Sequence, residues 1–96
     1  MSYYGITIQQ LKILSLIETD EKYGYQILKE LDDQILLGSL YNSLKSLERK
    51  GFVKSRWGDE INQAGRRKYY RITAEGQNCF DTLKGEMLTN FGLTSI

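Results

Sequence analysis

The chain has 96 residues, of which 41% are hydrophobic and 26% are charged, and its formal net charge is +1. This length and balance are typical of one folded domain and exclude a disordered chain. No apolar run approaches the roughly 18 residues that a membrane span needs, and the first five residues do not begin a secretory signal. We therefore expect a cytoplasmic protein with no membrane partner.

The sequence also excludes several kinds of active site. It holds no histidine, and Cys79 is its only cysteine. A disulfide framework, a Cys/His zinc site and a Ser–His or Cys–His catalytic pair therefore cannot form within the chain. The adjacent Asp32 and Asp33 would face different ways on a helix, which makes them a poor acid/base pair. We expect no enzyme activity, no metal site and no cofactor, and we leave a small-molecule effector undecided.

The basic residues are concentrated in one segment. Residues 45–71 carry nine cations and three anions, a net charge of +6, so the rest of the chain has a net charge of −5. A nearly neutral protein with one strongly basic segment can present a face that binds a polyanion such as nucleic acid.

The first half of the chain has helical patterns. A predicted helix over 7–18 is apolar almost all round, which indicates burial on more than one side, against either its own core or a second subunit. A polar break over 19–22 precedes a second predicted helix over 23–33. Residues 34–37 are too few for a helix and form either a small strand or a tight connection.

The third predicted helix, 39–50, is amphipathic. Leucines at 40, 44 and 47 form one inner stripe, and Gly51 follows where a left-handed C-cap is expected. By itself, such a helix is more often a solvated surface helix than a DNA contact. Its groups are nevertheless ones that read base edges, and the major groove, about 12 Å wide, admits one helix. The outer face holds no acid and consists of Ser39, Asn42, Lys45, Ser46 and Arg49.

A β-hairpin is predicted next. Residues 53–57 alternate with period two and 68–72 are rich in β-forming residues, so we expect two strands joined by a loop over 58–67. Basic side chains at the end of this loop can bind phosphates. The residues expected to face inward are Val53, Trp57, Tyr70 and Ile72, and the basic cluster is Arg66, Arg67 and Lys68.

A last helix is predicted over 74–90, after Thr73 as N-cap. Its apolar stripe is expected to extend past the small core onto a second copy of the chain. The segments of about 1–18 and 74–96 would then form a dimer interface as well. The residues expected there are Ile8, Leu11, Phe80, Leu83, Met87 and Phe91.

The order of elements is helix, helix, helix, hairpin, helix. It predicts a mainly α fold with a small β-hairpin wing (α+β), a single winged helix-turn-helix domain over 1–96. In that motif the second helix of the pair enters the major groove. The sequence therefore predicts a double-stranded DNA-binding protein, with a recognition helix over 39–50 and a wing over 58–68 on the flanking backbone or minor groove.

Residues 11–76 resemble the PadR family of winged-helix transcriptional regulators. The matching segments are YGYQILKEL (23–31), GSLYNSL (38–44), LERKGFV (47–53), WGDE (57–60) and GRRKYYRIT (65–73), followed by Gly76. The resemblance implies a nucleoid-associated homodimer on a palindromic operator, usually a repressor. It also implies DNA contacts through Tyr25, Ser39, Tyr41, Asn42, Lys45, Ser46, Arg66, Arg67 and Lys68.

The sequence departs from larger members of that family, which carry a C-terminal helical domain for which it has no room. Some short members bind planar aromatic drugs at the dimer interface, but Phe80 and Phe91 are better explained as dimer packing. Two other functions stay open. One is a centromere-binding adaptor of a plasmid partition system, which assembles on DNA beyond one site. The other is a protein-interaction module without DNA binding, against which the basic wing argues.

Overall fold

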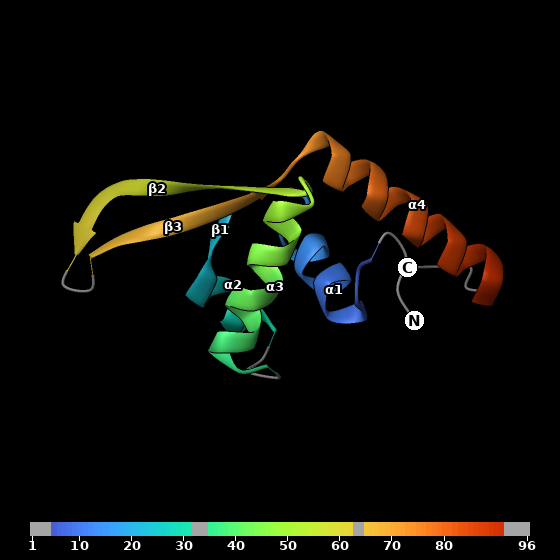
Figure 1. Cartoon of the computed structure of the whole chain (residues 1–96), viewed down its shortest axis with the longest axis horizontal. Coiled ribbons are helices and arrows are strands. Elements are labelled where there is room, and N and C mark those ends of the chain that lie inside the picture. Colours follow the sequence, from blue (N-terminus) through green and yellow to red (C-terminus); the bar gives the residue numbers. More distant parts are fainter. Residues whose placement is uncertain (1–4, 32–34, 63–64, 92–96) are drawn as a thin grey trace.

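The computed structural model describes residues 5–31, 35–62 and 65–91, without the side chains of 60–62 and 87–91. It confirms the predicted α+β winged-helix fold and adds a two-residue strand (Figure 1). The elements are α1 (Ile8–Leu16), β1 (Lys22–Tyr23), α2 (Gly24–Glu30), α3 (Leu37–Arg49), β2 (Val53–Asn62), β3 (Gly65–Ile72) and α4 (Ala74–Phe91). None of the helices in the described ranges is long and apolar enough to cross a membrane.

The core lies among α1, α2, α3 and the first half of α4. The leucine stripe of α3 is fully buried as predicted, because it faces the other helices. A capping box begins α1, in which the Thr7 hydroxyl accepts from the Gln10 N–H (3.1 Å) and the Gln10 side chain accepts from the Thr7 N–H (3.0 Å). The fully buried side chains are Ile13, Leu14, Ile17, Ile27, Leu40, Leu44, Leu47 and Val53.

The connection into α3 is shorter than expected. The helix begins at Leu37, two residues before the predicted start, and residues 35–36 are not a strand. Gln34 and the end of the predicted second helix lie outside the described residues. At its other end, α3 closes with a Schellman motif, in which Gly51 has φ 81° and the Phe52 N–H bonds to the Leu47 carbonyl at 3.0 Å. The left-handed cap predicted at Gly51 is confirmed.

The sheet has three antiparallel strands in the order β1-β3-β2. The pairs Lys22↔Tyr70 and Tyr23↔Tyr69 attach β1 to β3, which the sequence analysis missed by assigning Tyr23 to a helix. A two-residue strand has no periodicity to read, so only the pairing with β3 defines it.

The wing is longer than predicted, and the loop expected over 58–67 is wrong. Strand β2 continues to Asn62 and β3 starts at Gly65, with a register irregularity between Trp57 and Ile61. Trp57 lies on the same face of the hairpin as Val53 and Tyr70, as expected, but it is not buried, since it is 58% exposed. At this point the hairpin has left the body of the domain (Figure 1), so no core lies beneath the strand. Val53 and Tyr70 are buried, and Ile72 is half-buried against the core.

Helix α4 starts where the ends of three elements meet. The Thr73 hydroxyl accepts from the Gly76 N–H (3.0 Å) and donates to the Gly51 carbonyl (2.6 Å), which confirms the predicted N-cap. An ideal Cβ on Gly76 would lie 2.1 Å from the Phe52 carbonyl oxygen. A glycine is therefore required for this helix start to approach the backbone after α3 so closely.

Some of the residues expected at a dimer interface are buried in the core of the single chain, and one is exposed. Phe80 is only 6% exposed and Leu83 only 4%, so both belong to the core of the single chain. They are not the surplus apolar surface that the sequence pattern indicated, because the first turns of α4 pack on α1. Leu11 is half-buried against the same core, whereas Ile8 is 57% exposed. The side chains of Met87 and Phe91 lie outside the described residues.

Candidate nucleic-acid interface

The outer face of α3 is open to solvent, as its leucine stripe requires. Ser39, Asn42, Lys45 and Arg49 are exposed, and Ser46 is half-buried with its hydroxyl accepting from Lys50 Nζ at 3.1 Å. Glu48, an acid on the same helix, accepts a hydrogen bond from the Ser55 hydroxyl of β2 at 2.6 Å. This contact holds the carboxylate at the side of the helix, so the outer face presents only neutral polar groups and cations.

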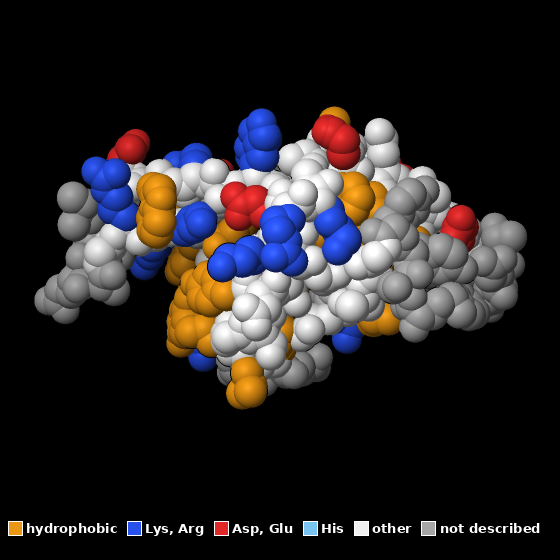
Figure 2. All heavy atoms as spheres, in the orientation of Figure 1, with side chains coloured by type: hydrophobic (Ala, Val, Ile, Leu, Met, Phe, Trp, Pro, Cys, Tyr) orange, Lys and Arg blue, Asp and Glu red, His pale blue; other side chains and the backbone are white. Residues whose placement is uncertain are grey.

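Basic side chains extend from this helix to the wing on one face of the molecule. Figure 2 shows them across the middle of that face and along the hairpin, beside hydrophobic surface under the wing. Arg66 and Arg67 are exposed, and Lys68 is half-buried. The structure therefore places the two basic groups that the sequence singled out, on α3 and on the wing, around a common surface.

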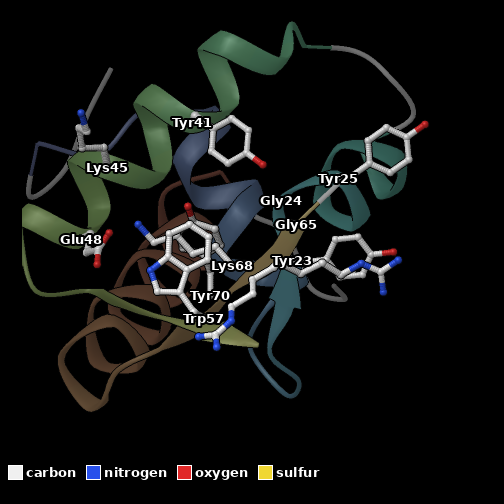
Figure 3. Close-up of a pocket in the computed structure, with 12 residues that line it drawn as sticks. Tyr23, Gly24, Tyr25, Tyr41, Lys45, Glu48, Trp57, Gly65, Lys68 and Tyr70 are labelled. Carbon is white, nitrogen blue, oxygen red and sulfur yellow. The ribbon is translucent and has the colours of Figure 1, made fainter. Parts of the chain in front are cut away.

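A groove of about 750 Å³ separates α3 from the wing (Figure 3). It is built by the end of β1, the start of α2, one side of α3 and the two wing strands. Its lining is aromatic and basic, and among the described lining residues Glu48 is the one with an acidic side chain. The lining residues are Tyr23, Gly24, Tyr25, Tyr41, Lys45, Glu48, Trp57, Gly65, Arg66, Arg67, Lys68 and Tyr70.

Aromatic rings position the wing cations. The Arg67 guanidinium lies 4.4 Å from the ring centroid of Tyr23, and Lys68 Nζ lies 5.5 Å from that of Trp57. Such cation–π contacts attract the charge to the ring face without removing it from water. The cations of the wing are therefore held along the groove.

Tyr41 and Tyr70 form another part of the groove. An ideal Cβ on Gly24 would lie 2.4 Å from the Tyr41 hydroxyl, so the absence of a side chain at Gly24 makes room for the Tyr41 phenol. Burial raises the pKa of Tyr70 to about 12, with smaller effects from Tyr41 and Glu48. Its phenol is therefore neutral at ordinary pH, and the cations determine the charge of the groove.

An ion pair fixes the outer strand of the wing. Arg56 Nε donates to Glu21 Oε2 at 3.0 Å, and the Arg56 guanidinium lies 4.9 Å from the Tyr69 ring centroid. The hydrogen bond from Arg56 lowers the pKa of Glu21 and raises that of Arg56. This pair joins the segment before β1 to β2, so it orients the wing relative to α2.

Comparisons with known proteins agree with this architecture. Residues 13–82 match the profile of the "Transcriptional regulator PadR-like family". The chain belongs to the PadR-like family of transcriptional regulators. The members of this family are regulators of transcription and not enzymes. A PadR family transcription regulator of Clostridium difficile is 32% identical, with a TM-score of 0.74 over 85% of this chain and 95% of that one.

Two further relatives bear on the site. The structure of Bacillus subtilis PadR in complex with operator DNA has a TM-score of 0.67 and 26% identity, over 79% of this chain and 46% of that one. An uncharacterized protein of Lysinibacillus sphaericus is 38% identical over 71 residues, which are 68% of this chain and 64% of that protein. The match to this curated relative thus spans less than two thirds of its length.

Sequence reasoning predicted the exposed outer face of α3 and the basic residues of the wing but missed part of the groove. Tyr23, Trp57 and Tyr70 were not expected to line a surface with Lys45 and Lys68. A usable signal was present, because tyrosines directly adjoin basic residues in both GRRKYYR and KYGY. Interleaving of this kind is frequent where a chain contacts nucleic acid.

Proposed function

We propose that this PadR-like chain binds double-stranded DNA sequence-specifically as a homodimeric transcriptional regulator, a repressor that acts in the cytoplasm on the nucleoid. The observation that carries the proposal is the common face formed by the acid-free side of α3 and the basic groove. The Bacillus subtilis PadR bound to operator DNA has the same fold, which supports this assignment.

Helix α3 enters the major groove in this proposal. Asn42 and Ser46 can exchange hydrogen bonds with base edges, while Lys45 and Arg49 reach bases or phosphates. One DNA backbone then crosses the groove between α3 and the wing. There it meets Arg66, Arg67 and Lys68, with Tyr25 and Tyr41 as hydroxyl donors, and this contact fixes the register of the helix.

The dimer is the part of the proposal that needs a second chain. Ile8 is a large apolar side chain exposed at the start of α1, and it can pack against a partner. We assign the rest of the interface to α1 and to the second half of α4, beyond the turns that Phe80 and Leu83 place in the core. A two-fold dimer would set its recognition helices about 34 Å apart, on the half-sites of a palindrome.

Mass measurement tests the stoichiometry. Sedimentation equilibrium of the protein alone, and with one duplex selected by the protein from a random pool, gives the number of chains in each species. We expect two chains free and two chains per duplex. A monomer, or one chain per duplex, would exclude the dimer. Continued loading along a longer duplex would indicate spreading beyond one site, as in a partition adaptor.

Replacement of Asn42 by alanine tests base reading. The variant should lose about 1–3 kcal/mol of preference for the selected duplex, because one base-edge contact disappears while phosphate contacts remain. Affinities for the selected duplex and a scrambled one are compared at one salt concentration. An equal loss on both duplexes would show that Asn42 does not read bases.

A further inference from the structure

Gly38 is a glycine in the first turn of α3 that no contact or backbone angle of the described residues explains. Six of the eight described glycines are explained internally. Gly5, Gly51 and Gly65 have positive φ, and a side chain at Gly24, Gly58 or Gly76 would come closer than 3.0 Å to other atoms. Gly38 has no positive φ, and none of the residues that the structure describes lies within 4 Å of its ideal Cβ.

A glycine in a helix destabilises it relative to alanine, since it orders a freer backbone and contributes no side chain. Gly38 therefore weakens α3, and no contact among the residues of 5–31, 35–62 and 65–91 compensates for it. Only Gly38 and Gly85 of α4 show this combination among the glycines that the structure describes. Gly85 lies away from the recognition face, so the two residues can be compared directly.

Gly38 lies on the outer face of α3, in line with Asn42. Residues four apart on a helix lie one above the other, which places Gly38 directly before Asn42 on the outer face. Arg49 continues the same row three turns after Gly38, opposite the buried leucines. The row thus begins with a residue without a side chain and continues with the short side chain of Asn42.

We propose that Gly38 is a positioning residue of the DNA interface, which lets the start of α3 approach the floor of the major groove closely enough for Asn42 to reach a base edge. The inference rests on the proposed function. Asn42 has a short side chain, and a hydrogen bond to a base needs donor and acceptor about 2.7–3.2 Å apart. A methyl group at position 38 would meet the DNA first and hold the helix away.

Two matched variants, Gly38→Ala and Gly85→Ala, test this. Each adds one methyl group to an exposed helical position with open space around it. We expect both to raise the midpoint of thermal unfolding. Gly38→Ala alone should weaken binding to a duplex selected by the wild-type protein, by about tenfold, a typical effect of one lost base contact. Wild-type affinity of Gly38→Ala would overturn the proposal.

A double-mutant cycle with Asn42→Ala identifies the mechanism. Gly38→Ala should change the affinity of the Asn42→Ala variant by less than about twofold, because the contact that it disrupts is already gone. A full loss in that background would overturn the proposed link to Asn42. If the wild-type protein selects no preferred sequence, the proposed function itself fails. That outcome is distinct from unchanged affinity of Gly38→Ala for a selected duplex, which overturns only the role of Gly38.

Discussion

Replacement of Gly76 by alanine is expected to lower the free energy of unfolding by at least about 3 kcal/mol. The new Cβ would lie 2.1 Å from the Phe52 carbonyl oxygen and 3.0 Å from its carbon. Both are backbone atoms, so no side-chain rotation relieves the overlap. That carbonyl also accepts the Thr73 N–H at 3.0 Å, and its displacement would separate the end of α3 from the start of α4.

The midpoint of urea unfolding, measured at a fixed protein concentration, checks this expectation. Gly85→Ala is the control, because it makes the same change in the same helix at a site where no described residue lies within 4 Å. We expect the control to be more stable than the wild type by up to about 1 kcal/mol. If both variants gained stability equally, α4 would not start in close contact with the segment after α3.

Removal of two wing cations, Arg66→Ala with Arg67→Ala, is expected to weaken binding to every duplex. It should reduce the dependence of log affinity on log salt by up to about two units, since each phosphate contact releases about one counterion. Both side chains are exposed and line the groove beside α3. The wing is not expected to read bases, so the ratio of specific to scrambled affinity should change little.

Lys54→Ala with Arg71→Ala is the matched control. These exposed residues are cross-strand partners at the base of the same hairpin, and neither lines the groove. The control removes the same charge, so it reports the general electrostatic effect. We expect a smaller change in the salt slope than for the groove pair. Equal losses from the two pairs would mean that net charge, rather than the groove, binds the DNA.

Local patterns in the sequence predicted the parts of the fold that depend on neighbouring residues. The leucine stripe of α3, the cap at Gly51 and the N-cap at Thr73 all follow from spacing along one segment. Trp57 lies on the predicted face but is exposed, because alternation assigns a face to a strand but does not show where the core beneath it ends. The apolar stripe of α4 likewise does not show where the core ends. Leu83 was expected at a dimer interface, but it is buried because the first turns of α4 pack on the core of the same chain.

One part of the candidate site could be predicted from local sequence and another part could not. The outer face of α3 could be predicted, because the buried leucines fix which residues face solvent. The groove could not, since it depends on the pairing of β1 with β3 that brings Tyr23 beside the wing. The contact between the Arg67 guanidinium and the Tyr23 ring joins residues more than forty positions apart, and no local pattern encodes it.

The most direct test of the account is a fluorescence anisotropy titration with two labelled duplexes, one from the region upstream of the protein's own gene and one with that sequence scrambled. Affinities must be measured at several salt concentrations, because phosphate contacts make them salt-dependent. We expect binding to the upstream duplex to be about a thousandfold tighter than to the scrambled one. Equal and steeply salt-dependent binding to both duplexes, or binding to neither near physiological salt, would contradict a regulator that reads its operator.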